Sequence, residues 1–191
     1  MNDTTATPSV LVVEDDPGLV DLYARWLADY DVRTATTGAD ALALVEAESF
    51  DVVLLDRQLP DRSGRSVLAD IRQMNCDCMV TMVTAVRPDV DIVEMRFDDY
   101  LVKPVDREEL LDTVDRLSRR MTYDEQVNQL YAQCSKLGVL EAEHGRDRLA
   151  GSDEYESLVR RIDELHDRTD QLVTSFEDHD FDDVFRDIPS S

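Results

Sequence analysis

The segment DVVLLD (residues 51–56) constrains the architecture of this chain most strongly, because four consecutive apolar residues stand between two aspartates. A continuous apolar run of this length is typical of a strand that is buried on both faces of a parallel sheet. The segment VLVV (10–13) has the same character. Shorter β-rich segments at 31–35, 79–83 and 100–102 complete a set of five predicted strands.

Amphipathic segments alternate with these strands as far as residue 120. Apolar residues recur there at the three- and four-residue spacing of a helix. The predicted helices cover 17–27, 39–45, 67–71, about 88–96 and 106–120. Alternation of five strands with helices predicts an α/β fold, a doubly wound open parallel sheet with helices on both faces.

The last third of the chain lacks strand signals and predicts an α-helical hairpin over 121–180. The pattern Thr122-x-x-Glu125 is a capping-box signature, which favours the start of a helix. Residues 145–151 are the expected break, and Asp153 is expected to cap the second helix.

Each helix of this hairpin carries an apolar stripe. The first stripe consists of Val127, Leu130, Tyr131, Cys134, Leu137 and Leu140. The second repeats at close to heptad spacing in Leu158, Ile162, Leu165, Thr169, Leu172 and Phe176. Because a helix pair alone buries little surface, we expect the stripes to dock on the first domain or on another copy. An acidic tail (181–191) follows, in which Phe181, Val184, Phe185 and Ile188 fit a short amphipathic helix.

The composition excludes several classes of partner. A net charge of −23 argues against nucleic acid or an anionic membrane bound through a broad basic surface. A hydrophobic content of 42% is sufficient for a packed core. No run of about 18 apolar residues is present, and the N-terminus, expected to be flexible over 1–8, does not look like a signal peptide. We therefore expect a soluble, cytoplasmic protein.

The balance of charged residue types is also unusual. Only Lys103 and Lys136 are lysines, whereas eighteen basic residues are arginines, and aspartate outnumbers glutamate thirty to thirteen. Strong self-repulsion is tolerable in concentrated salt, where the screening length shrinks to about 3 Å at 1 M. The composition favours a salt-loving organism over an acidic mesophilic protein.

Acidic side chains follow two of the predicted strands. Glu14, Asp15 and Asp16 come after the first strand, and Asp56 ends the third. In an open parallel sheet, ligands bind at the carboxyl ends of strands where the strand order reverses. Carboxylates gathered there favour a hard cation with oxygen ligands, most plausibly Mg²⁺. For Asp16, a metal ligand and a helix cap remain equal alternatives.

Two donors stand at the ends of the remaining strands. Thr84 ends the fourth strand, and Lys103 ends the fifth, directly before Pro104. A hydroxyl and an ammonium group are suited to phosphoryl oxygens. The proline can fix the backbone that aims the lysine, also through a cis bond.

Four segments together carry a family resemblance: VLVVEDD (10–16), VVLLDRQLPDRSG (52–64), MVTA (82–85) and DDYLVKP (98–104). Over roughly residues 9–120 the chain resembles the receiver domain of two-component response regulators. The resemblance implies a sheet of order 2-1-3-4-5 and a phospho-acceptor switch, with a sensor histidine kinase as partner.

The resemblance also assigns roles to individual residues. Asp56 would accept the phosphoryl group, and Lys103 would pair with it. Glu14, Asp15, Asp56 and the backbone carbonyl of Gln58 would hold Mg²⁺. Thr84 and Tyr100 would form the switch that reports phosphorylation. Such a protein would catalyse at most its own phosphorylation and dephosphorylation, so we expect no enzyme in the metabolic sense.

One interval departs from the family pattern. Thr84 and Lys103 are nineteen residues apart, a few fewer than in many receivers, so the fourth helix should be short. Arg96 stands where the family often has the glycine that closes this helix. Because this helix contributes to the dimer face of many receivers, the way in which this chain would form a homodimer stays open.

The helical region 121–180 looks like the HalX domain, an output region found with receivers in halophilic archaea. No winged helix or helix-turn-helix is recognisable, and we expect an unidentified downstream protein rather than nucleic acid as partner. One alternative is a constitutive dimerisation or scaffold protein whose receiver fold serves assembly. A metal-dependent phosphatase with Asp56 as nucleophile is disfavoured, because haloacid-type enzymes place the nucleophile after the first strand.

Overall fold

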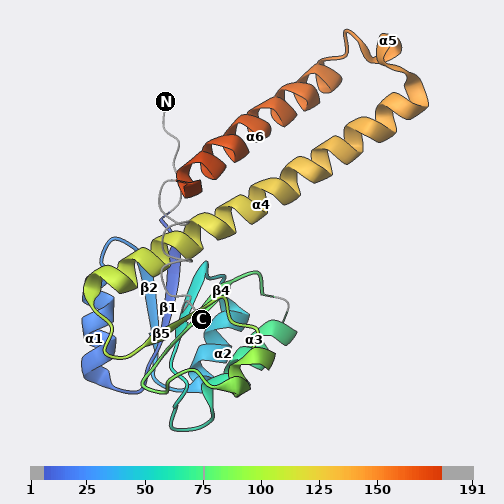
Figure 1. The fold of residues 1–191 in the computed structure, drawn as a ribbon. Coiled ribbons are helices and arrows are strands. Elements are labelled where there is room, and N and C mark those ends of the chain that lie inside the picture. The colour runs from blue at the N-terminus through green and yellow to red at the C-terminus, as the bar shows by residue number, and fades with distance from the viewer. Residues whose placement is uncertain (1–6, 75, 178–191) are drawn as a thin grey trace, which may run out of the picture. The chain divides into compact units, whose positions relative to one another are not determined.

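The computed structural model describes residues 7–74 and 76–177, and five parallel strands form its sheet (Figure 1). The strands are β1 (Ser9–Val13), β2 (Asp31–Ala35), β3 (Val52–Leu55), β4 (Met79–Thr84) and β5 (Asp99–Val102). They lie in the order β2-β1-β3-β4-β5, which confirms the predicted topology. Strand β2 pairs with one side of β1, and β3 pairs with the other side. The strand order therefore changes direction between β1 and β3, and the acidic residues after these two strands are neighbours.

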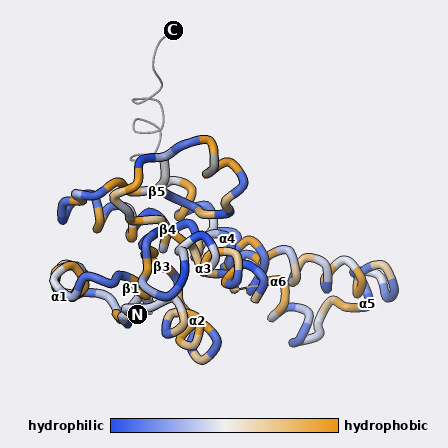
Figure 2. Tube along the Cα trace, turned by 90° about the horizontal axis from the view of Figure 1, so that it is seen from below, coloured by the Kyte–Doolittle hydropathy of each residue, from blue (hydrophilic) through white to orange (hydrophobic). Residues whose placement is uncertain are grey.

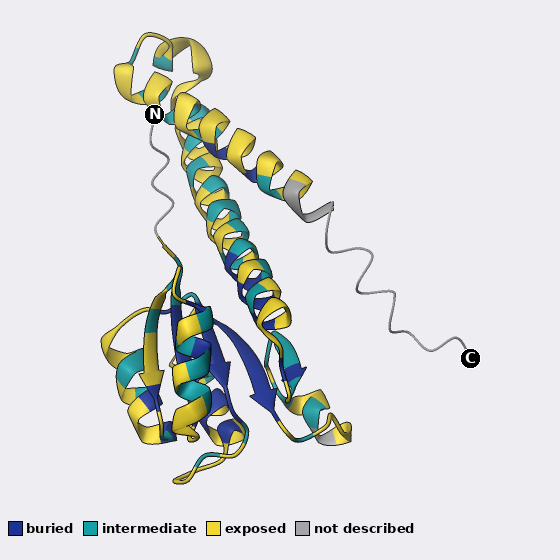
Figure 3. Ribbon diagram, turned by 90° about the vertical axis from the view of Figure 1, so that its left-hand side faces the viewer, coloured by how far each residue is buried: buried dark blue, intermediate teal, exposed yellow. Residues whose placement is uncertain are grey.

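Helices cover both faces of this sheet because the side chains of each central strand alternate between two cores. Val10, Val12, Val52 and Leu54 pack with apolar residues of α1 (Pro17–Trp26) and of the first part of α4 (Arg107–His144). The intervening residues Leu11, Val13, Val53 and Leu55 pack with α2 (Gly38–Ala47) and α3 (Gly64–Gln73). Figure 3 shows the central strands as buried and the outer faces of the helices as exposed.

The structure decides the role of Asp16. Its Oδ1 accepts hydrogen bonds from the backbone N–H of Gly18 at 2.7 Å and of Leu19 at 3.3 Å. Asp16 is therefore the N-cap of α1, which is the second of the two alternatives left open by the sequence.

The predicted fourth helix is reduced to a single 3₁₀ helix, η1 (Val90–Glu94). Three of its five residues are the β-branched Val90, Ile92 and Val93, which are stiff and form helices less readily. So short a helix is also unstable without packing, because helix nucleation is unfavourable. The prediction of a short element is confirmed, but its type and length differ from an α-helix over 88–96.

The predicted helix start at Thr122 is wrong, because α4 runs without interruption from Arg107 to His144. Its N-terminal part buries Leu110, Val114 and Leu117, as the sequence predicts. No glycine or proline stands between 106 and 137 to end the helix, and a capping-box pattern does not break a helix by itself. Compact units comprise residues 1–121 and 122–191, and the boundary between them lies within α4.

The second unit contains the rest of α4, the short α5 (Arg146–Leu149) and α6 (Asp153–Glu177). Gly145 and Gly151, both with positive φ, flank α5 at the predicted break. The cap of α6 differs from the prediction, because Ser152 Oγ accepts from the backbone N–H of Tyr155 at 3.4 Å and Asp153 is the first helical residue.

The C-terminal part of α4 and α6 lie side by side (Figure 1). Tyr155 donates its hydroxyl hydrogen to Glu141 Oε1 at 2.7 Å, which ties the start of α6 to α4. Hydropathy alternates along α6 between hydrophilic and hydrophobic residues (Figure 2), and its Leu165 and Thr169 are buried. This pairing confirms the predicted helical hairpin.

The first predicted stripe is only partly correct. Leu130 and Leu137 are half-buried, whereas Tyr131 is 75% exposed and Cys134 is exposed. Successive helical residues are turned by about 100°, and Tyr131 lies beyond the buried edge of the stripe that contains Leu130. The side chain of Phe176 and the tail 181–191 lie outside the described residues. Within the described ranges, none of the helices has the length and apolar character that crossing a bilayer requires.

Candidate functional site

The site lies at the carboxyl ends of the strands, where the turns after β1, β3 and β5 meet. Glu14 and Asp15 follow β1, Asp56 follows β3, and Lys103 follows β5. Glu14 and Asp56 are 3% and 6% exposed, whereas Asp15 is exposed to solvent. The structure thus brings together three carboxylates and one ammonium group that are far apart in the sequence.

Lys103 bridges two of these carboxylates. Its Nζ donates to Asp56 Oδ2 at 2.5 Å and also to Glu14 Oε2. The Lys103–Pro104 peptide bond is cis. A cation between two buried acids compensates their mutual repulsion, which would be large at low effective dielectric.

Burial and charge act in opposite directions on these groups. Burial is the largest influence on Glu14 and raises its pKa, although Lys103 acts to lower it. Burial lowers the pKa of Lys103, but the hydrogen bonds to Asp56 and Glu14 more than offset this, so that the pKa lies above its ordinary value. Lys103 is therefore held in its charged form.

The carboxylates also fit a divalent cation. Glu14, Asp15 and Asp56 each offer an oxygen atom, and these atoms lie within 4.8 Å of one another. Opposite ligands of Mg²⁺ are about 4.2 Å apart, twice the usual Mg–O distance, so small side-chain movements would complete such a set. Gln58 lies beside it, because its backbone N–H donates to Asp56 Oδ1 at 3.0 Å. Asp16 is a helix cap and does not belong to this group.

Gly64 holds the backbone of Asp56 at close range. A Cβ atom at this position would lie 2.1 Å from the carbonyl oxygen of Asp56. Gly64 also donates its backbone N–H to the carbonyl oxygen of Arg57 at 2.8 Å. In the sequence, Gly64 stands out only as the last residue of the segment 52–64. A glycine at the first position of a helix, as here in α3, is the signal that could have indicated its role.

Thr84 and Tyr100 meet at the backbone of Val86. Thr84 is fully buried, and its Oγ1 accepts from the Val86 N–H at 3.3 Å. Tyr100 donates its hydroxyl hydrogen to the Val86 carbonyl oxygen at 2.6 Å. The two residues therefore bond to the N–H and to the carbonyl oxygen of the same residue, Val86, which the sequence did not single out.

Replacement of Lys103 by methionine is expected to lower the free energy of unfolding by about 3 kcal/mol in EDTA, because two buried carboxylates lose their cation. Mg²⁺ should restore part of this loss, since the ion can replace the missing positive charge. Urea unfolding with and without Mg²⁺ measures both effects. Lys136→Met, at an exposed position on α4, is the matched control and should change little. A Lys103→Met chain as stable as the parent in EDTA would contradict this reasoning.

Comparison with known proteins agrees with this geometry. Residues 10–115 match the family model of the response regulator receiver domain, which is more than half of the chain. The chain therefore belongs to the response regulator receiver family. Residues 119–185 match the HalX domain, so that a receiver is followed by a HalX domain, as the resemblance implied.

Relatives extend this comparison. A Haloferax volcanii protein, for which a role as transcriptional regulator has been suggested, is 40% identical over 183 residues, covering 86% of this chain and 31% of that protein. RpaA of Synechocystis, named a DNA-binding dual master transcriptional regulator, is 36% identical over 120 residues, covering 59% of this chain and 50% of RpaA. This chain thus spans half or less of the length of these two relatives. The Haloferax relative confirms the prediction of a haloarchaeal type of sequence.

Among solved structures, the response regulator TrrA of Thermotoga maritima in complex with Mg²⁺ and beryllium fluoride is similar to this chain. The identity is 31% and the TM-score is 0.53, over 58% of this chain and 98% of TrrA. This likeness supports the receiver fold, and the bound Mg²⁺ is a property of TrrA.

Proposed function

We propose that Asp56 accepts a phosphoryl group from a phosphohistidine of a sensor histidine kinase, and that this chain is a response regulator of a two-component system. The observation that carries the proposal is the contact of buried Asp56 with Lys103, beside Glu14 and Asp15. A nucleophilic carboxylate, a charged amine and further oxygen ligands are the groups that phosphoryl transfer requires.

In the transfer, an Asp56 carboxylate oxygen attacks phosphorus, and the phosphorus–nitrogen bond to the kinase histidine breaks. The electrons of that bond stay on the imidazole nitrogen, and the imidazole takes up a proton as it leaves. Lys103 neutralises charge on the phosphoryl oxygens and therefore holds the group in line. When bound by Glu14, Asp15, Asp56 and the Gln58 carbonyl, Mg²⁺ supplies further neutralisation. Phosphorylation and dephosphorylation of Asp56 switch the protein between two states, and we assign it no metabolic reaction.

The switch consists of Thr84 and Tyr100. A phosphoryl group adds a charge of about −1.5 to −2 at Asp56 and offers strong acceptors. If Thr84 turns its hydroxyl toward these acceptors, it releases the Val86 N–H that it now contacts. Tyr100 contacts the same residue through its hydroxyl, so its hydrogen bond is expected to change with that of Thr84.

The output is assigned to the HalX region. Two named relatives suggest a role in transcription. The net charge of −23 opposes direct contact with DNA, so we assign a protein partner to the signal. This partner would link the receiver to transcription. The receiver family supports a cytoplasmic location for the chain.

Intact mass of the full chain tests the proposal after incubation with acetyl phosphate in concentrated KCl. One phosphoryl group is expected with Mg²⁺ present and none in EDTA. If neither acetyl phosphate nor beryllium fluoride binds to the folded chain, the proposal is wrong, and a receiver fold used for constitutive assembly becomes the better hypothesis.

A further inference from the structure

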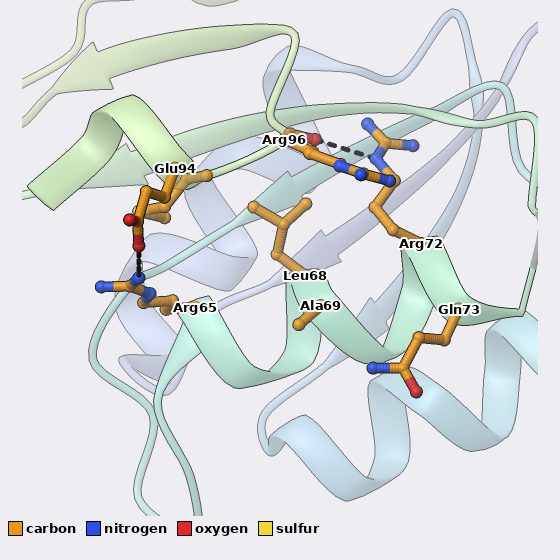
Figure 4. Close-up of a pocket in the computed structure, with 8 residues that line it drawn as sticks. Arg65, Leu68, Ala69, Arg72, Gln73, Glu94 and Arg96 are labelled. Atoms are coloured by element: carbon orange, nitrogen blue, oxygen red, sulfur yellow. Dashed lines mark hydrogen bonds and ion pairs between the residues drawn. The ribbon is translucent and has the colours of Figure 1, made fainter.

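A pocket of about 320 Å³ lies between α3 and the segment 94–96, which contains the last residue of η1 and the two residues after it (Figure 4). Leu68 and Ala69 of α3 form one side of it, and Met95 lies on the other. Since η1 has only five residues, it covers less of α3 on this side than a full helix would. The pocket is separate from the carboxylate site, with which it shares no residue.

Two contacts hold the walls of the pocket together, one on either side of Leu68 along α3 (Figure 4). Arg65 lies 3.4 Å from Glu94 Oε2. Arg72 donates from Nε to the carbonyl oxygen of Arg96 at 2.9 Å. Arg72 is fixed in turn by Asp98, at 2.6 Å, and by the Cys78 carbonyl oxygen, at 2.7 Å. The wall that carries Arg96 is therefore positioned by a network of bonds.

The pocket is basic although the chain as a whole is strongly acidic. Three arginines and one glutamate line it, in a chain of net charge −23. The charge of Arg72 is compensated by Asp98, but the guanidinium of Arg96 has neither a hydrogen bond nor an ion pair among the described residues. The Arg65–Glu94 pair is weak because the Glu94 side chain is 84% exposed. Arg65 can therefore exchange Glu94 for another carboxylate.

From this arrangement we infer that the pocket binds a carboxylate-bearing peptide segment of a partner protein. Arg96 and Arg65 pair with acidic side chains of the segment, since a guanidinium binds a carboxylate through two parallel hydrogen bonds. An apolar side chain of the same segment packs on the exposed Ala69 and the half-buried Met95. A nucleic acid fits less well, because phosphate backbones require an extended basic surface and this chain repels polyanions.

The pocket is linked to the proposed switch, and this part of the inference rests on the proposed function. The wall at 94–96 belongs to the segment between Thr84 and Tyr100. Phe97 follows this wall directly, and its ring lies 5.5 Å from that of Tyr100. If the switch moves this segment, it changes the affinity for the peptide, and by linkage the peptide changes the affinity for the phosphoryl group.

Fluorescence anisotropy of the full chain tests the inference, with a labelled decapeptide of alternating aspartate and leucine as probe. Concentrated KCl is the appropriate medium, because screening to about 3 Å then suppresses all but contact-range pairs. We expect saturable binding of the peptide to the parent chain. The affinity should be about tenfold lower in Arg96→Ser, because this variant loses one ion-paired contact with the peptide. Arg87→Ser is the matched control, since Arg87 is exposed in the same loop but does not line the pocket, and should leave affinity unchanged.

Two further measurements test whether carboxylates are recognised and whether the pocket is linked to the switch. A decapeptide of alternating asparagine and leucine should bind at least tenfold more weakly if carboxylates are recognised. Equal binding of both peptides, or equal loss in the Arg96 and Arg87 variants, overturns the inferred site. Beryllium fluoride with Mg²⁺ should change the peptide affinity, and no change overturns the link to the switch. A phosphoryl adduct in the separate mass experiment would leave the proposed function standing in either case.

Discussion

An Asp56→Asn chain is expected to take up no phosphoryl group from acetyl phosphate and Mg²⁺, whereas the parent chain takes up one. The asparagine amide keeps the shape of the side chain and an acceptor for the Gln58 N–H, but it is a poor nucleophile and carries no charge. Lys103 retains Glu14 as a partner, so the variant should remain folded. Intact mass measures the adduct, and thermal unfolding establishes that the variant is folded.

Asp21→Asn is the control for this experiment, because Asp21 is an exposed aspartate on α1 and lies outside the carboxylate group. It should accept the phosphoryl group as the parent chain does. An adduct that persists in folded Asp56→Asn would show that another residue is the acceptor, and peptide mapping would then be directed first to Asp15.

A Gly64→Val chain is expected to lose about 4 kcal/mol or more of its free energy of unfolding, in the exceptional range for single substitutions. A Cβ at this position would lie 2.1 Å from the Asp56 carbonyl oxygen and 2.8 Å from the Arg57 Cα, both backbone atoms that cannot move aside cheaply. Urea unfolding gives the stability change. Where a folded fraction remains, its phosphoryl uptake should also fall, because the acceptor is displaced.

Gly138 provides the opposite case in the same molecule. A Cβ added there meets nothing within 4 Å, and the residue lies within α4. Gly138→Ala is therefore expected to stabilise the chain by about 1 kcal/mol through helix propensity. If both substitutions shifted the urea midpoint equally, close packing at Gly64 would not be the cause.

The sheet and the composition of the site were predictable because each depends on a local and strong signal. Segments 10–13 and 52–55 are uninterrupted apolar runs, and such runs have few alternatives to a buried parallel strand. Once the strands are parallel, their carboxyl ends share one edge, so Glu14, Asp56 and Lys103 were expected at the same edge of the sheet. The direct bridge from Lys103 to both acids needed coordinates, because side-chain contacts do not follow from strand positions alone.

Other features were missed because the local sequence pattern is compatible with more than one structure. The pattern at Thr122 has the residues of a capping box, yet α4 continues through it, since no residue nearby forces a break. The type of η1 depends on what packs against it, and the sequence between Thr84 and Lys103 indicated only that the element is short. Tyr131 was assigned to the wrong face because a mixed spacing of three and four residues leaves the limits of a stripe uncertain.

The scarcity of lysine turns the bridge at Lys103 into a chemical reporter. The chain has two lysine side chains, one exposed on α4 and one 14% exposed between two carboxylates. Only a neutral amine attacks an acylating reagent, so the exposed Lys136 should react readily while Lys103, held in its charged form, is protected. Ligands that rearrange the carboxylate site would then alter labelling at a single position. Lysine footprinting of this protein therefore compares one amine at the site with one internal reference, without any engineered probe.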